Sequence, residues 1–106
     1  MPKYMFKASY GSEGAAGVLS KGGASRRDAI AKAAESVGGK LESFYFAFGG
    51  TDAYVVVELP DNATAASMAL TVSSSGVVGV ETAVLIDPDE IKPGGSGSPD
   101  YRPPGA

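Results

Sequence analysis

Residues 41–59 read LESFYFAFGGTDAYVVVEL, and this stretch decides the fold. The runs 41–48 and 53–59 are rich in aromatic and β-branched residues, which are typical of β-strands. The residues between them, 49–52, begin with two glycines and end with an aspartate, a composition typical of turns. The stretch therefore predicts a β-hairpin.

The length of the predicted turn sets how the two strands of the hairpin pair. Alternate residues of a strand point to opposite faces, so one face of this hairpin is entirely apolar. We expect helices to cover that face, since burying one phenylalanine contributes about 2–3 kcal/mol. The expected opposite pairs are Phe48 with Ala53, Phe46 with Val55 and Phe44 with Val57, and Leu59 extends the same face.

The rest of the chain supplies two more strands and two helices. Alternation predicts strands at 3–10 and 78–86. One helix is expected to begin with Ser25 as its N-cap and to end at Gly38-Gly39. A second helix is expected to follow a cap at Asp61 or Asn62 and to end at Gly76. Residues 11–23 are expected to form a glycine-punctuated connection that contains a short helical turn through Ala15, Ala16, Val18 and Leu19.

This βαββαβ order predicts an α+β fold of the ferredoxin-like type. Such a sandwich has a four-stranded antiparallel sheet with both helices on one face. On the first and last strands along the chain, alternate side chains are expected to face the helices. These are Tyr4, Phe6, Ala8 and Tyr10 on the first strand, and Val80, Thr82, Val84 and Ile86 on the last.

The opposite face of the predicted sheet carries aromatic and apolar side chains together with charges. It is too apolar for a surface that meets only water, which predicts that a second copy of the chain covers it. The expected interface residues are Met5, Tyr45, Tyr54, Val56 and Leu85, and the charged residues on that face are Lys7, Glu58 and Glu81.

Composition excludes several kinds of chemistry. The 106 residues include no cysteine and no histidine, so the chain has no disulfide, no thiolate nucleophile, no imidazole base and no Cys or His metal site. We therefore expect neither a metal nor a cofactor. The net charge of −3 argues against nucleic acid as a partner. The sequence shows no signal-peptide-like run and no apolar stretch of roughly 18 residues, so we expect no membrane association and a cytoplasmic location.

Composition changes near the C-terminus. We expect a single domain over residues 1–92 and a tail over 93–106, PGGSGSPDYRPPGA, which is too rich in proline and glycine to form a core of its own. Two interpretations remain open. The tail is either flexible or held by a neighbouring subunit or the sheet edge, with Tyr101 and Arg102 as its anchors.

The stretch from Gly38 to Pro60 resembles the GYD-domain family. The likeness lies in GGK at 38–40, FYF at 44–46, G-x-T-D at 49–52 and VELPD at 57–61, and it extends more weakly over residues 2–90. The family is named for Gly-Tyr-Asp. Gly49 and Asp52 match that motif, whereas Thr51 stands where the tyrosine is expected. The resemblance implies a small ferredoxin-like protein similar to the dimeric α+β barrel group, and it implies no established reaction.

Several residues on the open side of the predicted sheet are candidates for chemistry. Glu58 is expected to form a cross-strand ion pair with Lys7, or to act as a general base if a cover raises its pKa. Tyr45 and Glu81 complete the set of candidate catalytic residues. At the hairpin tip, Asp52 is expected to hold the turn or to contact a ligand, and Gly49 is expected to adopt a positive φ.

Two further clusters carry charge. Arg26 and Arg27 are expected in the first turn of a helix, an unfavourable place for cations. A solvated helix end is the preferred interpretation, and a bound anion or a charged partner is the alternative. Gly22-Gly23 precedes the two arginines, but no phosphate-loop motif is present, which argues against nucleotide binding. The acidic residues Asp87, Asp89 and Glu90 indicate turn chemistry in preference to a divalent-ion site.

Two functions remain open from sequence. The first is a small homo-oligomeric module with a binding or structural role. The second is a cofactor-independent enzyme of the dimeric α+β barrel type, acting on a small molecule at the open sheet face. A closed polar cavity of about 300 Å³ or more at that face favours the enzyme, and tight packing favours the module.

Overall fold

The computed structural model describes residues 1–95 and 97–105 and contains a four-stranded sheet with helices. All strand pairs are antiparallel, and the strand order is β2-β3-β1-β4. This is an α+β fold whose order fits the ferredoxin-like type, as predicted. Along the chain the elements are β1 (Lys3–Tyr10), α1 (Ser12–Lys21), α2 (Gly23–Ser36), β2 (Lys40–Phe46), β3 (Ala53–Glu58), α3 (Asn62–Ser73), β4 (Val78–Leu85) and a 3₁₀ turn (Pro88–Glu90).

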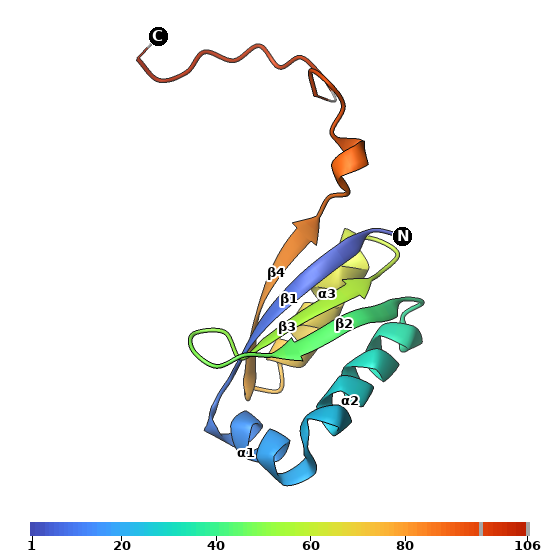
Figure 1. Ribbon diagram of the computed structural model, residues 1–106, viewed down its shortest axis with the longest axis vertical. Coiled ribbons are helices and arrows are strands. Elements are labelled where there is room, and N and C mark those ends of the chain that lie inside the picture. Colours follow the sequence, from blue (N-terminus) through green and yellow to red (C-terminus); the bar gives the residue numbers. More distant parts are fainter. Residues whose placement is uncertain (96, 106) are drawn as a thin grey trace.

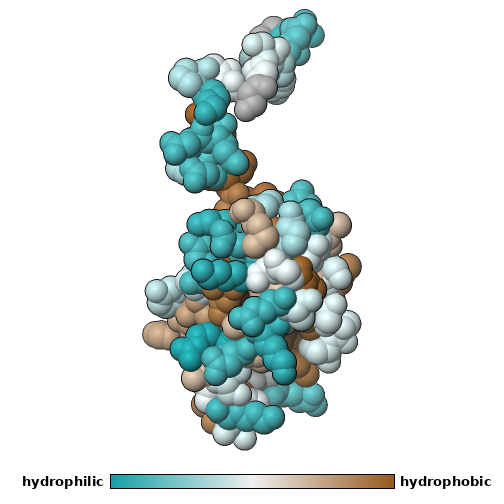
Figure 2. Space-filling view, turned by 90° about the vertical axis from the view of Figure 1, so that its right-hand side faces the viewer, coloured by the Kyte–Doolittle hydropathy of each residue, from teal (hydrophilic) through white to brown (hydrophobic). Residues whose placement is uncertain are grey.

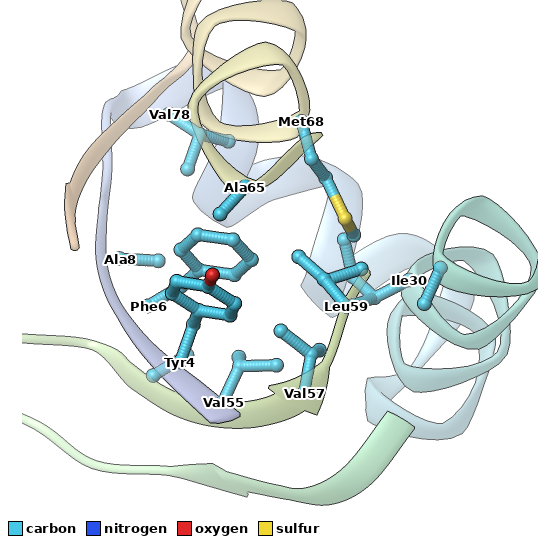
Figure 3. Close-up of a cluster of buried hydrophobic side chains, with 12 residues drawn as sticks. Tyr4, Phe6, Ala8, Ile30, Val55, Val57, Leu59, Ala65, Met68 and Val78 are labelled. Atoms are coloured by element: carbon cyan, nitrogen blue, oxygen red, sulfur yellow. The ribbon is translucent and has the colours of Figure 1, made fainter. Parts of the chain in front are cut away.

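The core lies between the sheet and two of the helices. Figure 3 shows Tyr4 and Phe6 of β1 side by side, with Ile30 of α2 and Met68 of α3 pointing into the same cluster. Helices α2 and α3 therefore cover one face of the sheet, and α3 lies behind the strands in Figure 1. The buried apolar residues are Tyr4, Phe6, Ala8, Ile30, Ala34, Ala53, Val55, Val57, Leu59, Ala65, Met68 and Val78.

One hydrogen bond joins the central strand to a helix. The hydroxyl of the fully buried Tyr4 donates to Asn62 Oδ1 at 2.6 Å, at the first residue of α3. This contact gives the buried hydroxyl a partner, which it needs because an unpaired polar group in a core is costly. It also fixes the start of α3 against β1.

The predicted register of the hairpin is wrong by two residues. Phe46, and not Phe48, lies opposite Ala53, and Phe44 lies opposite Val55. The connection is longer than expected because β2 ends at Phe46, and the Ala47 N–H donates to the Asp52 carbonyl at 2.8 Å. Phe48 consequently sits in the loop and is 98 % exposed. A shift of two residues keeps Phe44 and Phe46 on the helix side, as predicted.

The connection predicted at 11–23 is instead mostly the helix α1, and α2 begins at Gly23 without Ser25 as its N-cap. Two of the glycines there, Gly14 and Gly23, lie where the backbone passes close to other parts of the fold. A Cβ at Gly14 would lie 2.7 Å from the Val77 carbonyl, and one at Gly23 would lie 2.7 Å from the Phe46 ring. The glycines that indicate a linker in the sequence thus allow close packing of the backbone at Gly14 and Gly23.

The far end of β4 is also less covered than predicted. Val84 lies opposite Tyr4 in the register, on the helix side of the sheet, yet it is 56 % exposed, and Ile86 is 58 % exposed. Strand β4 is an edge strand, and Tyr4 reaches only the first residue of α3. Helix α3 therefore does not extend over Val84.

The C-terminal tail stands away from the folded body. Figure 1 shows it leaving the end of β4, and Figure 2 shows a hydrophobic spot where tail and body join. Every described residue from Ile86 onward is exposed, Tyr101 to 70 %. The predicted contact with the edge of the chain's own sheet is therefore wrong, whereas contact with another subunit stays a prediction.

Within the described residues, none of the helices combines the length and the apolar character that crossing a membrane requires.

Candidate functional site: the open face of the sheet

We call the sheet surface opposite α2 and α3 the open face. The strand register arranges its side chains in rows that cross the sheet. One row runs Tyr45, Tyr54, Lys7, Glu81, the next runs Ser43, Val56, Met5, Ala83, and the last runs Lys40, Glu58, Lys3, Leu85. The predicted interface residues other than Tyr101 therefore lie together on this one surface.

Aromatic and apolar side chains on the open face are accessible. Tyr45 is 70 % exposed and Tyr54, directly opposite on β3, is 40 % exposed. Met5 and Val56 face each other on the two central strands and are half-buried by their neighbours. Figure 1 shows no helix in front of these central strands. The centre of the open face is thus apolar and uncovered.

The charged residues pair differently from the prediction. Glu58 lies opposite Lys3, and Lys7 lies opposite Tyr54, so the predicted ion pair between Lys7 and Glu58 is wrong. The cause is the antiparallel register, which places Met5 and Val56 between the two charges. Lys7 Nζ instead lies 3.5 Å from an oxygen of Glu81.

A second ion pair lies at the other end of the open face. Lys3 Nζ donates to Glu42 Oε1 at 3.0 Å. This hydrogen bond, together with the opposite charge of Glu42, raises the pKa of Lys3 above its ordinary value. Both ion pairs are accessible to water, so they contribute little to stability by themselves.

The candidate catalytic residues divide between two rows. Tyr45, Lys7 and Glu81 share a row, whereas Glu58 lies four residues after Tyr54 on β3, two rows away. The Lys7–Glu81 pair could exchange a proton with a bound molecule. An exposed carboxylate is a weak base, however, and general-base catalysis benefits from a cover that excludes water. Among the residues that the structure describes, none covers this row.

A hollow lies beside the β1–β4 end of the same row, next to the hairpin loop. It has a volume of about 540 Å³ and is open to solvent. Thr51 and Ser9 contribute to its wall, and the Ser9 hydroxyl donates to the Gly50 carbonyl at 2.9 Å. Sequence reasoning did not single out Ser9. No sequence signal marks Ser9, because only the fold brings the end of β1 beside the hairpin loop. The lining residues are Lys7, Ser9, Gly50, Thr51, Gly79, Val80 and Glu81.

Comparison with protein families decides what kind of chain this is. The model of the GYD domain matches residues 4–93. The chain belongs to the GYD-domain family. Comparison with curated proteins and with solved structures gave no match. The match ends where the proline- and glycine-rich tail begins.

The family motif of this GYD domain lies beside the hollow. Gly49 has a φ of 140°, the positive value predicted for it. Asp52 holds the loop against β1, because its Oδ2 accepts a hydrogen bond from the Tyr10 N–H at 2.8 Å and its own N–H donates to the Ala8 carbonyl at 2.8 Å. Thr51 of the same loop lines the hollow. The motif thus positions the loop that borders the open face.

The acidic residues after β4 form a turn in this GYD domain. Asp87 Oδ1 accepts a hydrogen bond from the Asp89 N–H at 3.0 Å and caps the 3₁₀ turn Pro88–Glu90. Across the part of the chain that the structure describes, no group of three acidic, histidine or cysteine residues is arranged to hold a metal ion.

Proposed function

We propose that this GYD domain is a homodimeric module that self-associates through the open face, with a binding or structural role. The observation that carries the proposal is the uncovered row of Tyr45 and Tyr54 beside the apolar pair Met5 and Val56. An antiparallel sheet that faces water usually alternates to polar residues. On this face Tyr45, Tyr54, Met5 and Val56 interrupt the polar positions.

The charge distribution favours a second copy as the occupant. The open face carries both signs, with Lys3 and Lys7 on β1 and with Glu58 and Glu81 on the strands beside it. Under two-fold symmetry each copy offers the other the same mixed surface, so lysines can approach glutamates across the interface. A strongly acidic or strongly basic partner would leave charges of one sign unpaired.

The hollow favours a second candidate function, a cofactor-independent enzyme. Its polar lining includes Lys7 and Glu81, and a partner lying on the open face would close it. Enclosure would strengthen the electrostatic interactions of this pair with a small substrate. A structure of the assembled form separates the two functions, since a closed polar cavity supports the enzyme and tight packing supports the module. A cytoplasmic location remains a prediction of both.

Sedimentation of the full chain tests the dimer. We expect the parent to sediment as a dimer at micromolar concentration and Val56→Lys to sediment as a monomer, because a lysine at the centre of the open face would be buried without a partner. Leu19→Lys is the matched control, since Leu19 is 87 % exposed on α1 and lies outside the open face. A monomeric parent, or equal loss of the dimer in both variants, contradicts the proposal.

A further inference from the structure

A cleft on the helix side of the molecule is distinct from the open face. It lies between α1 and the first turns of α2, where β1 ends and β4 begins, and has a volume of about 320 Å³. That size is at the lower end of the range typical of small-molecule sites. Tyr10, Val18 and Val78 give it apolar walls, and Lys21 and Arg26 contribute positive charge.

Arg26 has an unusual environment for a charged residue. Its Nε is inaccessible to solvent and has no hydrogen-bond partner. The side chain borders both the cleft and a small apolar gap in the core between α2 and α3. A buried guanidinium nitrogen without a partner is costly. An anion in the cleft would offset this cost by pairing with the guanidinium through its terminal nitrogens, since Nε itself is inaccessible.

The charge around the cleft is of one dominant sign. Within the described part of the chain neither Arg26 nor Lys21 forms an ion pair, although Glu13 is also in the lining. The neighbouring Arg27, by contrast, pairs with Asp28 at 3.3 Å and does not line the cleft. The amino end of α2, whose N-cap Gly22 offers no side-chain acceptor, adds partial positive charge.

We propose that this cleft binds a small molecule with an acidic head group and an apolar body, anchored by Arg26. A carboxylate or a phosphate ester fits the guanidinium, because both accept its N–H groups in a charge-assisted manner. The apolar body lies against Tyr10, Val18 and Val78. This site does not depend on the dimer, since its lining lies outside the open face.

Titration of the isotope-labelled full chain, followed by amide NMR shifts, tests the proposal. The probes are benzoate and phenyl phosphate, and benzyl alcohol is the neutral control. We expect both anions, or one of them, to shift the amides of Gly14, Val18 and Ser25 with a dissociation constant of about 1 mM or tighter. The anion that binds more tightly identifies the head group. No shift with either anion, or equal shifts with benzyl alcohol, overturns the proposal.

The adjacent arginines supply a matched pair of variants. Arg26→Met keeps an apolar stem and is expected to weaken anion binding by about tenfold or more, while Arg27→Met leaves it unchanged. Without a probe, Arg26→Met should melt no lower than the parent, because it removes an unpaired polar group. If Arg26→Met does not fold, Lys21→Met replaces it and should weaken binding several-fold. Equal binding by Arg27→Met and the cleft variants contradicts Arg26 as the anchor.

Discussion

Gly49 and Gly50 are neighbours in the hairpin loop with different backbone requirements. Gly49 has a φ of 140°, whereas Gly50 is outside the positive range, and a Cβ at either position would have open space around it. Only the backbone therefore distinguishes them. Gly49→Val should lower the free energy of unfolding by about 1 kcal/mol or more, and Gly50→Val should change it little. Denaturant melts of the two variants measure this difference, and equal stabilities would show that the positive φ carries no cost.

We expect the side chain of Asp52 to stabilise the fold through one acceptor atom, Oδ2. Asp52→Ala leaves the part-buried Tyr10 N–H without its partner, which should cost about 1–3 kcal/mol. Asp52→Asn retains a side-chain oxygen and should recover most of that loss. Thermal or denaturant melts of both variants provide the measurement. If Asn is as damaging as Ala, the charge of Asp52 matters and not the hydrogen bond.

Among the secondary-structure elements, strands were easier to predict from sequence than their pairing. Alternation assigned Phe44 and Val55 to the helix side correctly, because the side-chain period of a strand is two residues. Alternation does not show where a strand ends and its loop begins. The prediction that Phe48 belongs to the core is therefore wrong, because Phe48 lies in the loop and is exposed. The sequence predicts only a short helical turn where the structure has the full helix α1. The reason is that α1 buries no residue fully and contains Gly14 and Gly17.

The cap of α3 gives one element a pH-dependent stability. Asp61 accepts hydrogen bonds from the Thr64 hydroxyl at 2.7 Å and the Thr64 N–H at 2.8 Å, and these bonds lower the pKa of Asp61. A carboxyl with a lowered pKa in the folded state stabilises the fold above its ordinary pKa of 3.8. That contribution is lost as the pH falls through the lower, folded-state value.

Asp61→Asn tests this contribution, because asparagine also caps helices but does not titrate. We expect the variant to lose less melting temperature than the parent between neutral pH and about pH 3. Asp100→Asn in the exposed tail is the control for a change of charge alone. An identical acid response in Asp61→Asn and the parent would contradict the role of the cap.

At the scale of the whole molecule, the candidate sites differ in how far sequence could predict them. The open face follows from strand alternation, so Tyr45, Tyr54 and Val56 were assigned to it correctly. The exact row of each charge depends on the strand register, so the sequence could not show that Glu58 lies opposite Lys3 and away from Lys7. The cleft at Arg26 requires α1 to pack beside α2, and sequence indicated a linker there. The sequence marks Arg26 only as a cation near the start of a helix, and it does not show that Arg26 borders a cleft.

The C-terminal tail extends beyond the folded body that the family match covers. Its described residues make no contact that buries them, so deleting residues 93–106 should leave the melting temperature of the dilute chain unchanged. We still predict that Tyr101 and Arg102 contact a partner copy, and the deletion should therefore weaken self-association in sedimentation experiments. The full-length double variant Tyr101→Ala, Arg102→Ala should weaken it to a similar extent. A lower melting temperature would show that the tail packs on its own chain, and an unchanged dissociation constant would remove Tyr101 from the interface.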